Sequence, residues 1–174
     1  SGIELQATVL DTAYGKAEAA LDRLIAHKPD AIVLFGVAGR TKHIRVETIA
    51  RNRVSLLHPD RDRVTPAFRK LSAKGAPFLK VRGSAIHMRA AIRAAGARAE
   101  LSINAGNYLC NAVFYHALAA AKGQSPGPLT FFIHVPPARS GTQGMRALVR
   151  AGLAAVWAAA HEAKKLQIVP RRDG

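Results

Sequence analysis

The chain has 174 residues, of which 49% are hydrophobic and 21% charged, and its formal net charge is +15. This length supports one domain with a sizeable core, so we expect residues 1–174 to form a single domain. No apolar run is long enough to span a membrane, no signal peptide is recognisable, and the only cysteine, Cys110, cannot form an internal disulfide. These features argue against a membrane protein and against a disulfide-stapled secreted domain, and we expect a cytoplasmic protein.

The excess positive charge lies mostly between Arg40 and Arg98, where acidic residues are few. Strong positive charge is typical of proteins that bind nucleic acids. Aromatic residues that could stack on bases are scarce in this stretch, since only Phe68 and Phe78 occur. We therefore interpret the charge as a solvated basic face that attracts phosphates non-specifically, and we do not expect nucleic acid as a partner.

The chain begins with a pattern typical of a strand, a helix and a second strand. Residues 4–12 alternate apolar and polar side chains, which predicts a strand. Residues 16–28 place apolar side chains at helical spacing and predict an amphipathic helix that ends before Pro29. Residues 30–36 form a continuous apolar run, which is typical of a parallel strand buried on both faces. A right-handed crossover should connect the two strands.

The middle of the chain is harder to interpret. Residues 43–52 alternate again and predict an extended segment with Glu47 on its more polar side. Residues 53–83 are rich in proline and charge, so we expect loops with one short helix near residues 68–73. Residues 84–95 predict a helix with a serine N-cap.

Cys110 lies in the most informative stretch. Residues 98–103 predict a short strand, residues 104–107 a tight turn, and a helix follows from Tyr108 that is apolar around most of its circumference. Cys110 falls in the first turn of this helix, where free N–H groups and the helix dipole favour a thiolate. Free cysteines are also among the most buried residues and usually act as small apolar side chains, so position alone favours a structural thiol.

A buried strand and a long helix complete the chain. Residues 129–135 are strongly apolar and carry His134 near their carboxyl end. Residues 142–165 predict a long amphipathic helix. The side chains expected on its inner face are Met145, Leu148, Val149, Leu153, Val156 and Trp157.

Three side chains capable of chemistry therefore lie at strand ends or at a helix start: Glu47, Cys110 and His134. A thiol attacks a carbonyl well when an imidazole takes its proton, and a carboxylate that fixes the imidazole tautomer assists it. Simpler interpretations also exist. Glu47 can pair with a nearby arginine on an exposed strand, and His134 can be a hydrogen-bonded histidine at a strand end.

Three segments resemble signatures of the pyroglutamyl peptidases, also called pyrrolidone-carboxylate peptidases, which are cytosolic cysteine peptidases. The segment that carries the family's glutamate resembles FGVAGRTKHIRVETIARN, residues 35–52. The nucleophile segment resembles SINAGNYLCNAVFYHAL, residues 102–118, in which Ala-Gly-x-Tyr-Leu-Cys-Asn is the most specific part. The histidine segment resembles FFIHVP, residues 131–136, and the likeness extends over most of residues 9–160.

The resemblance implies an α/β fold, namely a three-layer α/β/α sandwich around a mostly parallel sheet of the phosphorylase/hydrolase-like type, and a homo-oligomer, frequently a tetramer. It implies that Cys110 is the nucleophile, His134 the base and Glu47 the acid that orients the base. The implied substrate is a peptide with an N-terminal pyroglutamate, cleaved through an acyl-enzyme without a metal or organic cofactor. The implied substrate-binding residues are Val37, Ala38 and Leu109.

The sequence also departs from the family pattern. The family's first strand and aromatic loop have no counterpart here, so we expect a preceding strand and helix to be missing. Val37 stands where Gln is frequent, Arg40 replaces the second glycine of a Gly-Gly-Arg motif, and Leu57 replaces an arginine linked to the site. These changes leave an alternative open, a divergent relative with altered or lost peptidase activity that interacts with nucleic acid through its basic surface.

Overall fold

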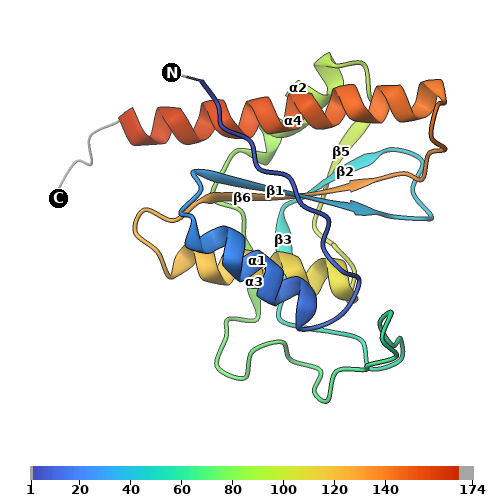
Figure 1. The fold of residues 1–174 in the computed structure, drawn as a ribbon, viewed down its shortest axis with the longest axis vertical. Helices are drawn as coiled ribbons and strands as arrows, with labels where there is room; N and C mark the ends of the chain where they lie inside the picture. The colour runs from blue at the N-terminus through green and yellow to red at the C-terminus, as the bar shows by residue number, and fades with distance from the viewer. Residues whose placement is uncertain (1, 169–174) are drawn as a thin grey trace.

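A four-stranded sheet lies between two pairs of helices in the computed structural model, which describes residues 2–168 (Figure 1). Its strands are β1 (Ala31–Val37), β2 (Ile44–Glu47), β5 (Ala99–Ser102) and β6 (Leu129–Val135). The order across the sheet is β1-β6-β2-β5, with β1 parallel to β6, β2 parallel to β5, and β2 antiparallel to β6. The expected α/β/α sandwich around a mostly parallel sheet is confirmed.

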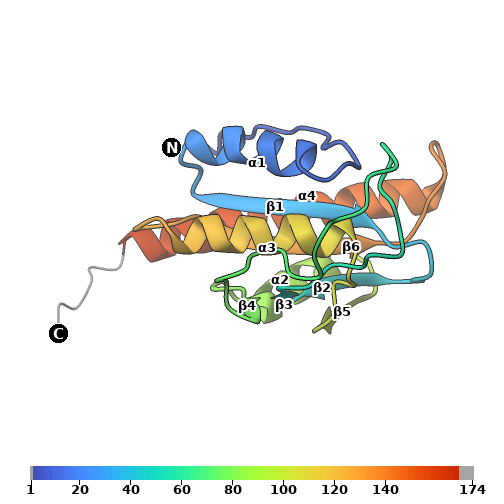
Figure 2. The same cartoon turned by 90° about the horizontal axis from the view of Figure 1, so that it is seen from below.

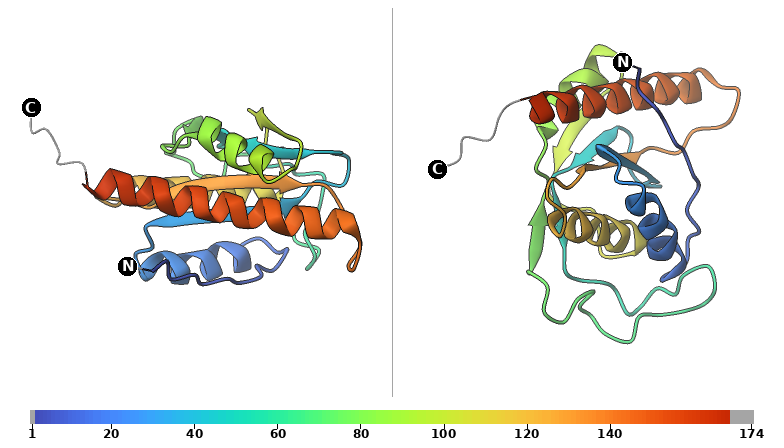
Figure 3. Two further views of the ribbon diagram at one scale, coloured as in Figure 1. Left: turned by 90° about the horizontal axis from the view of Figure 1, so that it is seen from above. Right: turned by 60° about the vertical axis from the view of Figure 1, so that its left-hand side comes forward.

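Two helices cover each face of the sheet. The helices are α1 (Lys16–Ala26), α2 (Ala85–Ala94), α3 (Leu109–Lys122) and α4 (Gln143–Ile168). α1 and α3 pack side by side on one face, around a core that includes Leu21, Phe114 and Phe132 (Figure 2). α2 and α4 cover the other face, where Met88 and Phe131 are buried (Figure 3). No helix among residues 2–168 combines the length and apolarity needed to cross a bilayer.

Position in the sheet decides how deeply each strand is buried. β6 lies between two other strands, and every residue of β6 except the last is buried. β1 is an edge strand, and its side chains alternate between buried and more exposed positions, with Phe35 45% exposed. The predicted parallel strand at residues 30–36 is therefore confirmed, but its predicted burial on both faces is wrong. An apolar run alone does not distinguish a central strand from an edge strand.

Two local predictions are wrong. Residues 4–12 form no strand, and their side chains are mostly exposed, because no neighbouring strand among residues 2–168 pairs with them. Residues 68–73 form bends rather than a helix. The side chain of Asn52 accepts the N–H of Ser72 and donates to two carbonyl groups of this loop, which replaces helical hydrogen bonds. A short strand that the sequence analysis missed, β4 (Phe78–Lys80), pairs antiparallel with β3 (Ile49–Arg51).

The inner face of α4 also differs from the prediction. Alanines four residues apart line the buried face, whereas Val149, Leu153 and Trp157 are each about half exposed. Small side chains allow α4 to approach α2 and the sheet closely, so the larger apolar side chains turn outward. The buried alanines are Ala151, Ala155, Ala159 and Ala163. The other predicted helices are confirmed, including the serine N-cap of α2, where Ser84 accepts the N–H of His87.

Candidate active site

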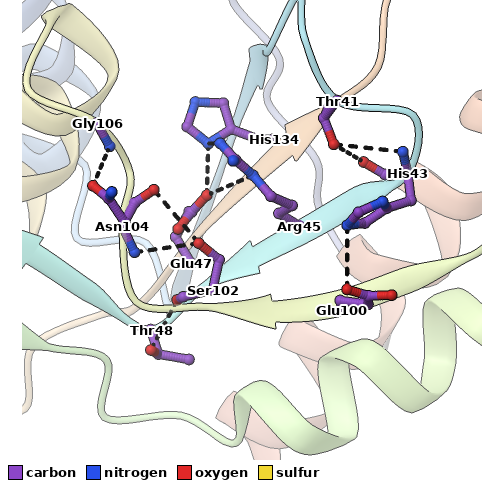
Figure 4. A network of polar contacts seen from close by, with 10 residues as sticks. All are labelled: Thr41, His43, Arg45, Glu47, Thr48, Glu100, Ser102, Asn104, Gly106 and His134. Atoms are coloured by element: carbon purple, nitrogen blue, oxygen red, sulfur yellow. Dashed lines mark hydrogen bonds and ion pairs between the residues drawn. The ribbon is translucent and has the colours of Figure 1, made fainter.

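Cys110 is the second residue of α3, and the turn at residues 104–107 leads into it as predicted. Gly106 has a φ of +84°, a conformation that favours glycine, and the side chain of Asn104 accepts its N–H (Figure 4). Cys110 is partly buried, and its sulfur lies directly over Gly36 of β1. A Cβ atom at Gly36 would lie 3.1 Å from Cys110 Sγ and 2.9 Å from the Phe132 ring, so only glycine leaves room for the thiol.

His134 is the neighbour of Gly36 across the sheet. β1 and β6 are parallel and in register at these two residues, so the His134 side chain points to the α3 face, where the sulfur lies. His134 is only 4% exposed, and its ring lies 4.9 Å from that of Phe132, centroid to centroid. The imidazole is therefore held in a fixed position beside Cys110.

Glu47 orients this imidazole. Its Oε1 lies 2.8 Å from Nδ1 of His134, and Glu47 is completely buried (Figure 4). The predicted position of Glu47 on the polar side of an extended segment is therefore wrong. Because β2 pairs antiparallel with β6, with Glu47 opposite Phe132, the carboxylate is turned onto the covered α3 face.

Arg45 is the first site residue that the sequence analysis missed. Its Nε lies 3.3 Å from Glu47 Oε1, and its Nη2 lies 3.4 Å from His134 Nδ1 (Figure 4). The spacing of two residues along β2 was an available signal, since residues i and i+2 of a strand share one face. The pairing of Glu47 with a nearby arginine, part of the simpler interpretation, is confirmed, but its exposed position is wrong because Glu47 is completely buried.

Opposing forces act on the protonation of His134. Burial favours the neutral ring, but hydrogen bonding to Cys110 and Glu47, together with the negative charges of both groups, outweighs it and raises the pKa of His134 to about 9. A protonated imidazole beside a thiol at a helix start can stabilise a thiolate and can also donate a proton. Residues 2–168 contain no group of three or more His, Cys, Asp and Glu side chains that could hold a metal ion.

The start of α3 also supplies backbone donors. The first hydrogen bond of the helix runs from Ala112 N–H to the Tyr108 carbonyl, which leaves the N–H groups of Leu109, Cys110 and Asn111 without a helical acceptor. The side chain of Leu109 is buried in the core, so only its backbone is available to a ligand. The backbone N–H groups of Leu109 and Cys110 are therefore suitable hydrogen-bond donors for a carbonyl oxygen that becomes negatively charged during a reaction.

The other two predicted substrate-binding residues lie at the end of β1. Val37 is 66% exposed and is paired in register with Val135, the residue after His134. Ala38 N–H donates to the Val135 carbonyl, so it is not free to bind a ligand. Val37 can contribute an apolar surface at the rim of the site, and Ala38 can contribute only its side chain or its carbonyl.

Tyr14 is the second residue that the sequence analysis missed. Its hydroxyl is buried without a hydrogen-bond partner among the described residues. Burial, followed by the charges of Tyr108 and Asp60, raises the pKa of Tyr14 to about 12, so the hydroxyl keeps its proton; the Cys110 charge adds to this effect. Its backbone N–H donates to the Asp60 carboxylate at 2.7 Å, and its ring meets that of Tyr108 edge to face. A tyrosine directly before a predicted helix was a weak signal.

The chain is similar in sequence to a family of known proteins. A model of the family described as pyroglutamyl peptidase matches residues 2–153. The chain is 31% identical over 137 residues to a pyrrolidone-carboxylate peptidase of Streptococcus suis, an alignment that covers 78% of this chain and 64% of the relative. It is 34% identical over 143 residues to that of Thermococcus onnurineus, covering 78% of this chain and 68% of the relative. The chain thus spans just under two thirds of the length of the Streptococcus relative.

Solved structures show the same fold. The pyrrolidone carboxyl peptidase of Thermococcus litoralis superposes with a TM-score of 0.82 at 25% identity, covering 90% of this chain and 78% of that one. The pyroglutamyl peptidase I of Bacillus amyloliquefaciens gives a TM-score of 0.81 at 25% identity, covering 88% and 77%.

Proposed function

The chain belongs to the pyroglutamyl peptidase family, and from this premise we propose that it hydrolyses the amide bond after an N-terminal pyroglutamyl residue. One observation carries the proposal. The buried His134 holds Glu47 through Nδ1 at 2.8 Å and interacts with the Cys110 thiol, which lies at a helix start. This is the arrangement that nucleophilic attack by a thiol requires.

In the proposed first step, the Cys110 thiolate attacks the acyl carbon of the pyroglutamyl residue and forms a carbon–sulfur bond. The carbonyl oxygen becomes an oxyanion, for which the N–H groups of Leu109 and Cys110 are suitable donors. Protonated His134 then gives its proton to the leaving amine as the carbon–nitrogen bond breaks, and a thioester remains.

In the proposed second step, water attacks the thioester carbon. Neutral His134 takes a proton from this water, the carbon–sulfur bond breaks, and free pyroglutamate is released. Glu47 would keep the imidazole in one orientation and stabilise its positive charge in both steps.

Substrate recognition would depend on the polar groups of the lactam ring. The unpartnered Tyr14 hydroxyl could donate a hydrogen bond to the ring carbonyl, and Val37 offers apolar surface for the ring edge.

We also propose that residues 1–174 form a single peptidase domain, and that several copies of the chain assemble into a homo-oligomer in the cytoplasm. The exposed apolar side chains Val149, Leu153 and Trp157 on α4 support an interface, and light scattering after size exclusion would measure the assembly.

The test compares a fluorogenic pyroglutamyl amide with the matched prolyl amide, whose ring lacks the carbonyl. We expect turnover of the pyroglutamyl amide only, and its loss in Cys110→Ala and in His134→Ala. Iodoacetamide labelling of Cys110 is measured in parallel, because it does not depend on the substrate. Absence of turnover with a reactive thiol would favour the divergent relative with changed chemistry, and equal turnover of both amides would contradict the pyroglutamyl assignment.

A further inference from the structure

A cavity of about 560 Å³, the hairpin cavity, lies beside the antiparallel strands β3 and β4. None of the candidate active-site residues lines it. Its polar lining is strongly cationic, and its apolar lining includes the exposed side chains of Phe78 and Ile103. The cationic lining residues are Arg51, Arg53, Lys70 and Lys80. No acidic side chain from residues 2–168 lines the cavity.

Two buried asparagines fix the walls of this cavity. Asn111 of α3 donates to the backbone carbonyls of Arg51 and Arg53, both at 2.8 Å, and accepts the N–H of Arg51 at 2.9 Å. Asn52 holds the loop at residues 72–75 through three hydrogen bonds of 2.7 to 3.1 Å. The cationic residues therefore project from a backbone that is already ordered, so binding an anion would cost little further ordering.

The four cations lack acidic partners. None of them forms an ion pair within the part of the chain that the structure describes. The guanidinium of Arg51 donates only to the Ile103 carbonyl, at 3.4 Å, and the Lys80 ammonium lies 5.9 Å from the centre of the Phe78 ring. Four positive charges around one cavity repel each other, and an anion bound between them would offset this repulsion.

A second basic cavity provides the contrast. It lies near the loop between β1 and β2, and two of its four arginine and lysine side chains are compensated: Arg98 pairs with Glu100 and Arg45 with Glu47. Among the described residues, its Arg40 and Lys42 form no ion pair. The hairpin cavity thus holds four lysine and arginine side chains without an acidic partner among the described residues, against two in the other cavity.

We propose that the hairpin cavity binds a nucleoside polyphosphate. Its volume falls within the range of small-molecule sites, about 300 to 1,000 Å³. Lysine and arginine side chains bind phosphate oxygens, and the exposed Phe78 face can stack on one aromatic base. Because Phe78 is the only aromatic side chain that lines the cavity in the described part of the chain, one nucleotide fits this site better than a nucleic-acid strand does.

The test is calorimetric titration of the full chain with three probes: adenosine triphosphate, inorganic tripolyphosphate and adenosine. We expect adenosine triphosphate to bind most tightly, tripolyphosphate to bind about tenfold more weakly, and adenosine alone to show no measurable binding. The affinity for both phosphate probes should fall as salt concentration rises.

Variants separate the cavity from general surface charge. Arg53→Gln combined with Lys70→Gln should weaken both phosphate probes about tenfold or more, whereas Phe78→Leu should weaken only adenosine triphosphate. The matched control, Arg40→Gln combined with Lys42→Gln, removes the same charge from the other basic cavity and should change neither affinity by more than about twofold. Circular dichroism and thermal unfolding establish that each variant is folded.

Three results would overturn the proposal. Equal weakening by the two double variants would assign the binding to diffuse surface charge. Equal affinity for adenosine triphosphate and tripolyphosphate would remove the base from the site. Tighter binding of a single-stranded oligonucleotide than of adenosine triphosphate, weakened equally by both double variants, would indicate a nucleic-acid surface instead.

Discussion

Replacing Glu47 with glutamine should lower the pKa of His134 and narrow the pH range of activity on the alkaline side. Glu47 Oε1 lies 2.8 Å from His134 Nδ1, and both side chains are almost inaccessible to solvent. Burial of the imidazole opposes its protonation, but hydrogen bonding to Cys110 and Glu47 raises the pKa of His134 from 6.5 to about 9. Glutamine keeps the shape of the side chain and removes its charge.

The size of the effect follows from this pKa. The difference between 6.5 and about 9 corresponds to roughly 3 kcal/mol in favour of the imidazolium, and Glu47 shares this contribution with Cys110. A hydrogen bond to a charged group contributes about 1.5 to 3 kcal/mol. We therefore expect the pKa of His134 to fall by about one to two pH units. Because protonated His134 supplies the proton to the leaving amine and is about half protonated at pH 9 in the wild type, kcat/KM at pH 9 should fall about fivefold to fiftyfold.

Two measurements check this prediction. The pH profile of kcat/KM for the pyroglutamyl amide should lose activity at lower pH in Glu47→Gln than in the wild type. Nuclear magnetic resonance titration of the His134 ring follows the same pKa without turnover. Glu100→Gln is the control, since Glu100 pairs with His43 at 3.4 Å on the surface and should leave both measurements unchanged. An unchanged His134 titration in Glu47→Gln would refute the reasoning.

Three further substitutions test neighbouring contacts. Arg45→Met removes a positive charge 3.4 Å from Nδ1 of His134, so the alkaline limit of the kcat/KM profile should move upward; a downward shift would contradict this. Tyr14→Phe should raise KM for the pyroglutamyl amide about threefold to tenfold with little change in kcat, and an unchanged KM would remove the hydroxyl from the pocket. Gly36→Ala places a methyl group 3.1 Å from the thiol sulfur and should abolish most activity. The control is Gly39→Ala, whose methyl group meets no atom within 4 Å and should be tolerated. Equal loss of activity in the two variants would count against the assigned position of the sulfur.

The positions of Glu47, Cys110 and His134 at strand ends or a helix start could be predicted from sequence because each lies in a short, locally determined element, whereas their proposed roles came from the resemblance to the family. The strand, turn and helix around Cys110 depend on neighbouring residues, including Gly106 with its positive φ. The apolar run that ends near His134 is long enough to identify a buried strand. Only the contacts between these elements needed the folded chain.

The failures have a common cause, which is dependence on partners far along the chain. The pattern of residues 4–12 suits a strand, but a strand forms only beside another strand. The inner face of α4 is lined by alanines because α2 and β1 lie close to it, and helical periodicity does not report that distance. The burial of Glu47 likewise follows from the antiparallel pairing of β2 with β6, which brings Glu47 within hydrogen-bond distance of His134, 87 positions further along the chain.

The unsatisfied polar atoms of the described chain support the proposed site by an argument that does not depend on the family. Buried side-chain atoms without a hydrogen-bond partner are Tyr14 Oη, Glu47 Oε2 and Arg45 Nε, of which Arg45 Nε still lies in the ion pair with Glu47 Oε1 at 3.3 Å. Elsewhere the buried polar side chains are satisfied; Asn52 and Asn111, for example, use their amides to hold neighbouring backbone. Leaving a buried polar group unpaired costs about 1 to 3 kcal/mol, so such groups persist where a ligand or water completes them. All three lie around His134 and Cys110, and this is where a substrate that supplies the missing partners would be bound.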